Sequence, residues 1–332
     1  MLRATILIPT HRHAATLPMA VASVQSQGRD EIEILIVGDG ANDALRSVAL
    51  SLAAADRRIR FFDFPKGPRH GEGHRHVALR EARGRIVCYQ SDDDLWLPNH
   101  LDVMEAALKE ADFAGGMHVN VGKDGKLRGY YFDLEQPAFR EPYLEWRANG
   151  LGDWASGGFG LSFAAHSLDA YRRLPEGWAT SPDNRTTEHW MWHKFVRQAW
   201  CRVKCPPVPV ALHFPAPERA SWSDERLAGE LRGWAEIIAR PDGMARVYQA
   251  MTEEMGERLL RQKAAEMGRH DQEIRQLRAE AEAGRAWAVE RGLRRMAEAE
   301  RDRLVASTSW RMTAPLRALA DRLKALRSRR AT

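Results

Sequence analysis

The stretch Ile86-Val-Cys-Tyr-Gln-Ser-Asp-Asp-Asp-Leu-Trp-Leu-Pro98 decides the fold, because an apolar run ends here in three consecutive carboxylates. Its β-branched and aromatic start predicts a buried strand, and its final proline suits the first turn of a following helix. We therefore expect Asp92, Asp93 and Asp94 at the carboxyl end of a strand. Adjacent carboxylates repel one another unless a cation neutralises them, and Mg²⁺ or Mn²⁺ prefers such oxygen ligands. The alternative is a solvated acidic turn with Asp94 or Asn99 capping a helix.

The residues around this stretch alternate between strand and helix patterns. Apolar runs predict strands at residues 4–8, 32–37, 59–62 and 86–89. Helical spacing or composition predicts helices at residues 17–27, 43–54 and 77–82. This order is typical of an α/β fold with a mostly parallel sheet and helices on its faces, in which ligands bind beyond the carboxyl ends of the strands.

Polar clusters follow each predicted strand. They are Pro9-Thr10-His11-Arg12 after the first strand, Gly38-Asp39-Gly40 after the second, and the Gly-rich loop at residues 66–76, with Arg69 and Arg75, after the third. A ligand can approach closely beside the glycines, the His11 ring can stack on a base, and the basic loop can cradle a diphosphate or a sugar. The alternatives are an ordinary turn at Gly38-Asp39-Gly40 and a surface position for His11.

Taken in order, these motifs resemble family 2 glycosyltransferases of the GT-A fold over roughly residues 3–215. The matching segments are Pro9-Thr10, residues 20–27, residues 34–40, Ala82-Arg-Gly84 and residues 91–98. The resemblance implies a nucleotide-sugar lying across the strand ends. It implies that Pro9, Thr10, His11 and Asp39 face the nucleoside, and that Asp92 and Asp93 hold the ribose and the metal-bound diphosphate.

Two departures from the family pattern affect the expected metal site. Gly38-Asp39-Gly40 replaces the usual Asp-Asp-Gly, and Ser91 replaces the first acid of the common Asp-x-Asp-Asp. Metal ligation therefore rests mainly on Asp93, with Asp92 or Asp94 as the second carboxylate. Several GT-A enzymes complete the site with a C-terminal histidine, which makes His213 a candidate ligand; a structural role for a lone histidine is the alternative.

The segment between the acidic cluster and residue 222 holds the expected acceptor site and catalytic base. We predict a helix at residues 97–111, a strand at 113–119, and a hairpin turn at 123–126 that leads to a strand at 127–131. Residues 133–160 are rich in aromatic side chains that suit sugar rings, although many such side chains are simply core. Family members carry an acidic base where this chain has Glu188, with Asp183 as the second choice; the alternative is that Glu188 only complements a helix dipole.

The C-terminal third has a different composition. Residues 224–306 are dense in Ala, Glu, Arg, Leu and Met, which predicts long helices. Leu316, Leu319, Leu323 and Leu326 form one stripe of a last helix with a basic opposite face. We therefore expect a glycosyltransferase domain at residues 1–222, a helical extension at 223–306 and a basic amphipathic helix at 307–332. The last helix would bind either an anionic membrane surface or another subunit.

Charge and cysteine content limit the partners and the compartment. From Arg311 onward seven Lys and Arg stand against Asp321 alone, so the net charge of +5 belongs to the tail and a nucleic-acid partner is not expected. Cys88, Cys201 and Cys205 are too few for a disulfide framework, and Cys201-x-x-x-Cys205 lacks a second Cys/His pair for a metal. The N-terminus enters a strand directly and no apolar run would span a bilayer. We expect a cytoplasmic protein, peripheral to the inner face of the plasma membrane if the tail binds lipid.

The sequence therefore predicts a metal-dependent, inverting glycosyltransferase of cell-surface polysaccharide assembly. Its donor would be a UDP-, GDP- or dTDP-sugar, its cofactor Mn²⁺ or Mg²⁺, and its acceptor a hydroxyl of a glycan or a lipid-linked molecule. A nucleotidyltransferase is the first alternative, but it should carry a Gly-rich Arg and Lys phosphate signature where this chain has Pro9-Thr-His-Arg12. An inactive sugar-binding scaffold is the second, but it would lose the carboxylates.

Overall fold

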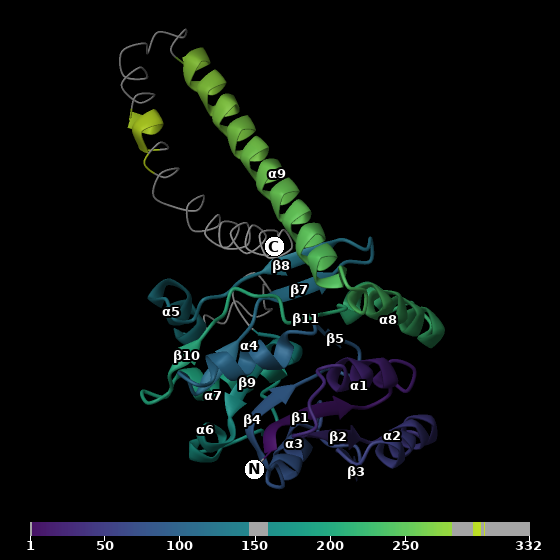
Figure 1. The fold of residues 1–332 in the computed structure, drawn as a ribbon. Helices are drawn as coiled ribbons and strands as arrows, with labels where there is room; N and C mark the ends of the chain where they lie inside the picture. Colours follow the sequence, from purple (N-terminus) through teal and green to yellow (C-terminus); the bar gives the residue numbers. More distant parts are fainter. Residues whose placement is uncertain (1, 146–158, 281–294, 300–301, 303–332) are drawn as a thin grey trace, which may run out of the picture. The chain divides into compact units, whose positions relative to one another are not determined.

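The computed structural model describes residues 2–145, 159–280, 295–299 and 302 (Figure 1). The chain divides into two compact units, one ending at Val247 and the other beginning at Tyr248. The first unit is built on a seven-stranded sheet with the strand order β10-β6-β9-β4-β1-β2-β3. The bounds of these strands are β1 Leu2–Thr10, β2 Ile32–Asp39, β3 Ile59–Phe64, β4 Gly84–Tyr89, β6 Phe113–Gly115, β9 Ala164–Ser167 and β10 Val203–Lys204.

The four N-terminal strands β3, β2, β1 and β4 pair in parallel, and β9 is antiparallel to its neighbours β4 and β6. Their central residues, such as Ile6, Leu7 and Ile36, are fully buried, as expected when helices cover both faces of a parallel sheet. All four predicted strands are confirmed. The carboxyl ends of β1, β2 and β4 meet at one edge of the sheet, and the predicted polar clusters follow them.

Helices connect the strands. Their bounds are α1 Leu17–Gln25, α2 Asp43–Ala55, α3 Glu72–Leu79, α4 His100–Ala107, α5 Pro137–Glu145, α6 Leu168–Arg173 and α7 Thr187–Val196. Helix α2 begins where the side chain of Asn42 accepts a hydrogen bond from the Leu45 amide. Helix α3 begins at Glu72, earlier than the predicted start at residue 77, so Arg75 lies on a helix and not in the Gly-rich loop.

The prediction of a helix at residues 97–111 is wrong about where the helix begins. Leu95–Trp96 form the short strand β5, which pairs antiparallel with β11, Ala211–Leu212, and helix α4 begins only at His100. The amide of Leu97 donates to the carbonyl of Val210 at 2.9 Å, so the ladder continues through residue 97. This pairing brings the residue after β11, His213, next to the residue before β5, Asp94.

The predicted strand at residues 113–119 is two strands. Strand β6 ends at Gly115, and β7, His118–Val121, forms a separate hairpin with β8, Leu127–Tyr130. The end of β6 is closely packed: a Cβ at Gly115 would lie 2.4 Å from the ring of Phe159. The predicted turn of the hairpin is confirmed, with Gly125 at a φ of 75° that favours glycine.

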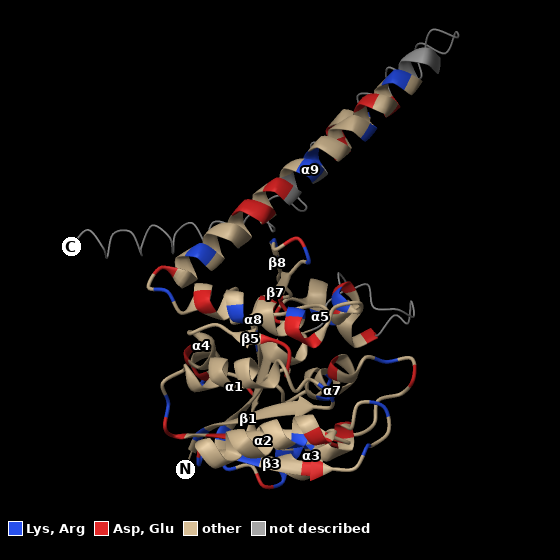
Figure 2. Cartoon of the chain, turned by 90° about the vertical axis from the view of Figure 1, so that its right-hand side faces the viewer, with Lys and Arg blue, Asp and Glu red and all other residues tan. Residues whose placement is uncertain are grey.

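The C-terminal region is helical where the structure describes it, as predicted. Helix α8 spans Asp224–Ile238 and α9 spans Gly243–Glu280, with acidic and basic residues along the length of α9 (Figure 2). Ala228 and Leu231 of α8 are buried, so the first compact unit continues past the boundary predicted after residue 222. The leucine stripe at residues 316–326 lies outside the described residues. Within the described part of the chain we find no helix with the length and hydropathy to cross a membrane.

Candidate functional site

A cavity of about 870 Å³ lies beyond the carboxyl ends of β1, β2 and β4. Most of the residues predicted for the site line this cavity. They are Pro9, Thr10, His11, Arg12, Asp39, Arg69, Arg75, Asp92, Asp94, Glu188 and His213. The lining does not include Asp93 and Asp183; Asp93 lines an adjoining cavity of about 450 Å³, which shares Arg12 and His13 with the first.

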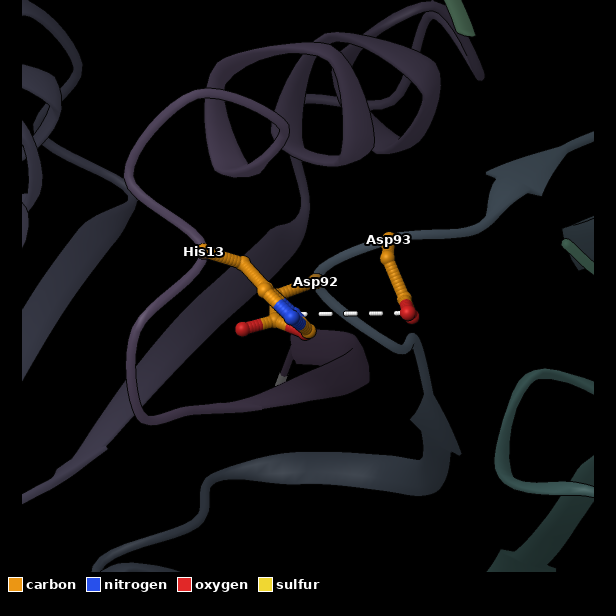
Figure 3. Close-up of side chains that lie close together, drawn as sticks. All are labelled: His13, Asp92 and Asp93. Carbon is orange, nitrogen blue, oxygen red and sulfur yellow. Dashed lines mark hydrogen bonds and ion pairs between the residues drawn. The ribbon is translucent and has the colours of Figure 1, made fainter. Parts of the chain in front are cut away.

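Asp92 is buried between the side chains of Thr10, the last residue of β1, and His13, in the segment that follows. Its carboxylate accepts a hydrogen bond from Thr10 Oγ1 at 2.5 Å and lies 2.9 Å from His13 Nδ1 (Figure 3). The hydrogen bond to Asp92 raises the pKa of His13 to about 9. The positive charge of a protonated His13 therefore balances part of the negative charge of the carboxylates.

Asp93 extends this cluster. Its Oδ2 lies 4.0 Å from His13 Nδ1, and its Oδ1 accepts from Ser91 Oγ at 2.6 Å (Figure 3). Burial, together with the charges of Asp94 and Asp92, raises the pKa of Asp93 to about 6. One ligand atom from each of His13, Asp92 and Asp93 lies within 4.8 Å of the others. Two carboxylates and an imidazole at this spacing fit a divalent cation that displaces the proton of His13.

His13 is a site residue that sequence reasoning missed. Its signal was its position: a second imidazole follows His11 in the same polar segment after β1, opposite the acidic end of β4. The pairing of β1 with β4 is what places the two segments side by side.

Asp94 and His213 form a separate ion pair. Asp94 is almost fully buried and accepts from His213 Nδ1 at 2.9 Å, Ser162 Oγ at 2.6 Å and the Phe214 amide at 3.2 Å. Burial alone would raise the pKa of Asp94, but the His213 charge lowers it, and Asp94 in turn raises the pKa of His213 against its own burial. A carboxylate that holds one nitrogen of a histidine fixes the direction of the other. Asp94 is thus arranged to orient His213.

Asp39 accepts hydrogen bonds from the loop that follows β3. Its two oxygens accept from Lys66 Nζ at 2.7 Å and from the Gly67 amide at 2.6 Å. Its backbone carbonyl accepts from His11 Nδ1 at 2.6 Å. Asp39 therefore joins the end of β1 to the loop at residues 66–71.

Glu188 lies in the first turn of α7 and lines the main cavity with 30% of its side chain exposed. Its Oε1 is 3.7 Å from Nη1 of Arg75, whose guanidinium carbon lies 4.6 Å from the ring centroid of Trp178. Asp183, the second predicted base, is fully exposed and pairs with Arg69 at 2.8 Å. Of the two acids, Glu188 lines the cavity and Asp183 does not.

Glu72, at the start of α3, holds the beginning of α7 in place. It is fully buried and accepts from Ser181 Oγ at 2.7 Å, Thr187 Oγ1 at 3.1 Å and the His70 amide at 3.3 Å. Burial would raise the pKa of Glu72, but these hydrogen bonds keep it below its ordinary value. Thr187 is the residue before Glu188, so Glu72 positions the predicted base. The sequence offered no signal for this role.

The expected acceptor region is described only in part. Residues 146–158, which include Trp154, lie outside the described residues. Of the aromatic side chains beside them, Tyr143 and Phe159 are buried in the core, and Phe159 also lines the main cavity.

Comparison with known proteins gives a family match over about half of the chain. The model of Glycosyl transferase family 2 matches residues 5–173. A GalNAc(5)-diNAcBac-PP-undecaprenol beta-1,3-glucosyltransferase of Campylobacter jejuni is 29% identical over 107 residues, which cover 31% of this chain and 34% of that protein. The UDP-Glc:alpha-D-GlcNAc-diphosphoundecaprenol beta-1,3-glucosyltransferase WfgD of Escherichia coli is 26% identical over 99 residues. These residues cover 30% of this chain and 38% of that protein. The chain thus spans about a third of the length of these relatives.

A solved structure shares the fold. The crystal structure of S. aureus TarS in complex with UDP-GlcNAc matches with a TM-score of 0.50 and 12% identity, covering 76% of this chain and 71% of that one. The likeness supports the predicted GT-A architecture, a mostly parallel sheet flanked by helices, with C-terminal helices in addition.

Proposed function

The chain belongs to glycosyltransferase family 2, and from this membership we propose that it transfers a sugar from a nucleoside-diphosphate donor to a hydroxyl of a glycan or lipid-linked acceptor. The observation that carries the proposal is that Asp92 and Asp94 after β4, the polar residues from Pro9 to His13 at the end of β1, and Glu188 share one cavity at the strand ends. In parallel α/β sheets this edge is where nucleotides bind.

The donor would lie across the strand ends. Pro9, Thr10 and His11 would face the nucleoside, and Arg12 and Arg69 would attract its phosphates. Arg75 supports an anionic ligand further, because its buried Nε and Nη1 have no hydrogen-bond partner among the described residues. A buried guanidinium with unused donors is costly unless a ligand completes it.

A divalent cation, Mn²⁺ or Mg²⁺, fits the carboxylate cluster. Asp93 would be its main ligand, with Asp92 and His13 beside it, and His213, oriented by Asp94, as a further ligand. When bound, such a cation neutralises the leaving diphosphate. Without it, His13 and His213 are the cations that offset the repulsion among the three carboxylates, together with the hydrogen bonds from Ser91 and Ser162.

Glu188 would act as the general base. A partly exposed carboxylate on the cavity wall can take the proton of the acceptor hydroxyl while that oxygen attacks the anomeric carbon. Attack from the face opposite the diphosphate, in a single displacement, inverts the anomeric centre. Asp183 remains the second candidate for the base. Its exposure and its ion pair with Arg69 argue against that role.

The acceptor class rests on the relatives. Two of them are named for glucosyl transfer to undecaprenol-diphosphate-linked glycans. We propose a lipid-linked acceptor of cell-surface polysaccharide assembly for this chain as well. The basic tail would then bring the cavity to the cytoplasmic face of the plasma membrane.

A screen of nucleotide-sugars tests the proposal. Purified protein is incubated with UDP-, GDP- and dTDP-sugars, with and without Mn²⁺, and the released nucleotide is identified. A glycosyltransferase releases a nucleoside diphosphate from one donor class, faster with the cation. A nucleotidyltransferase would leave the nucleotide-sugar unchanged until diphosphate is added, and would then form a nucleoside triphosphate and a sugar 1-phosphate. An inactive scaffold would bind a donor without releasing any product. Each result would contradict the proposal.

A further inference from the structure

We propose that Trp178 and Tyr89 are positioning residues for Arg75, and that they hold its guanidinium in place for the distal phosphate of the nucleotide donor. The inference rests on the proposed function, in which Arg75 binds an anionic group of the donor. It adds that this binding depends on a chain of buried hydrogen bonds, which begins in the sheet and ends beneath the guanidinium.

Arg75 has few hydrogen bonds of its own. The side chain is buried, and Nε and Nη1 have no hydrogen-bond partner among the described residues. Nη2 donates to the carbonyl of His70 at 3.5 Å, a distance at which a hydrogen bond is weak. The guanidinium lies instead over the indole ring of Trp178, with 4.6 Å between its carbon and the ring centroid. The position of the indole ring therefore sets the position of the cation.

Trp178 is fixed at two points. Its indole Nε1–H donates to Tyr89 Oη at 3.0 Å, and its backbone N–H donates to Tyr171 Oη at 2.9 Å. The preceding residue, Gly177, packs so closely that a Cβ there would lie 2.4 Å from the same Tyr171 oxygen. Because Trp178 is buried, its ring cannot turn without breaking a buried hydrogen bond.

The direction of each hydrogen bond in the chain is determined. His166 Nδ1 lies 2.9 Å from the carbonyl of Ser167, which only accepts, so Nδ1 carries a proton. Burial lowers the pKa of His166 to about 4, so the ring is neutral and Nε2 is an acceptor. Tyr89 Oη, at 2.7 Å from Nε2, donates its proton there and accepts from Trp178. The Tyr89 hydroxyl thus has a single arrangement, and it orients the indole ring.

This chain connects the strand that carries the acidic cluster to the predicted base. Tyr89 is the last residue of β4, which leads into Asp92, and Arg75 lies on the cavity wall with Nη1 3.7 Å from Glu188 Oε1. In the proposed displacement the bond from the anomeric carbon to the diphosphate breaks, its electron pair stays on the distal phosphate, and Glu188 takes the acceptor proton. A fixed cation beside Glu188 suits the phosphate that gains this charge.

The test measures how much the distal phosphate adds to binding. Calorimetry with Mn²⁺ compares UDP, GDP and dTDP with their monophosphates, and the Kd of the monophosphate divided by that of the best-binding diphosphate is the phosphate ratio. Arg75→Gln should lower this ratio about tenfold or more. Tyr89→Phe keeps the ring but removes the acceptor for the indole, and should lower it about three- to tenfold. Trp178→Phe removes the same hydrogen bond from the other side and should act alike.

A network that only stabilises the fold would leave the phosphate ratio unchanged. Tyr131→Phe is the matched control: its hydroxyl donates to the carbonyl of Cys205 at 2.8 Å, and the lining of the main cavity does not include it. This variant should keep the ratio of the unchanged protein.

A double-mutant cycle tests whether Tyr89 acts through Arg75. In the Arg75→Gln background, Tyr89→Phe should have no further effect on the phosphate ratio, because the side chain that it positions is gone. An equal decrease with and without Arg75 would overturn the inference, as would a ratio unchanged in both Tyr89→Phe and Trp178→Phe. Failure of every nucleotide to bind the unchanged protein would instead refute the proposed function, and the inference with it.

Discussion

Nη1 of Arg75 lies 3.7 Å from Oε1 of Glu188, which joins a donor-binding candidate on α3 to the predicted base on α7. The guanidinium is buried against Trp178, so its position is set by packing and not by the surface. The contact places the proposed donor-binding residue Arg75 next to the proposed base Glu188 in one cavity.

Glu188→Gln should remove turnover and spare the donor site. The variant keeps the shape of the side chain but cannot accept a proton, so kcat should fall about 10²-fold or more while the Kd for the nucleotide is unchanged. Steady-state kinetics and calorimetry measure the two quantities. Asp183→Asn is the matched control, and we expect near-normal turnover because Asp183 is exposed. The reverse pattern would move the base to Asp183.

Asp93→Asn should abolish the dependence of nucleotide binding on Mn²⁺. The amide is isosteric with the carboxylate but lacks the charge that the cation needs. Calorimetry of UDP or GDP with and without Mn²⁺ measures the effect. Asp94→Asn should weaken the metal response by a smaller factor, about 10- to 100-fold, because it acts through the orientation of His213. Equal metal responses in Asp93→Asn and the unchanged protein would remove Asp93 from the site.

Glu72→Ala should lower both stability and turnover. The change leaves the buried donors of Ser181 and Thr187 without an acceptor, which costs about 1–3 kcal/mol in the free energy of unfolding. Turnover should fall as well, because Thr187 precedes Glu188. Urea denaturation and kinetics are the measurements. Glu81→Ala, at an exposed glutamate just beyond α3, should change stability by no more than about 0.5 kcal/mol; a similar loss there would contradict the role of Glu72.

Stability should decline as the pH falls below about 6.5, the ordinary pKa of histidine. Burial lowers the pKa of His100 and His118 to about 3 and that of His166 to about 4. The unfolded chain therefore binds protons that the folded chain does not, and the free energy of unfolding falls by up to about 1.4 kcal/mol per pH unit for each histidine. Denaturation between pH 7 and pH 5 tests this, and His100→Gln should reduce the slope. A stability independent of pH over this range would refute the assignment.

Truncation after Ser307 should remove binding to anionic vesicles. The tail carries a local charge of +6 and the leucine stripe at residues 316–326, a pattern that suits the headgroup region of an anionic membrane. Co-sedimentation with anionic and neutral liposomes, at low and high salt, compares the full and truncated chains. Loss of an oligomer without any lipid binding would assign the tail to subunit contact.

The sequence by itself determined the sheet and the edge at which the site lies. Apolar runs, helical spacing and the Gly and Pro turns between them are local properties, and the strands at residues 4–8 and 86–89 were predicted from them. The position of Thr10, Asp39 and Asp92 on one cavity also followed, because polar residues at the ends of parallel strands meet at one edge. The match to family 2 supports the same architecture.

Only the tertiary structure decided which side chains meet. Asp94 pairs with His213 because β5 pairs with β11, and a two-residue strand has too little pattern to be read from sequence. Lys66 donates a hydrogen bond to Asp39, and His13 pairs with Asp92. Both contacts join segments that are far apart in the chain. Such contacts depend on strand pairing and loop packing, and these set distances of a few ångströms that residue type and spacing along the chain do not contain.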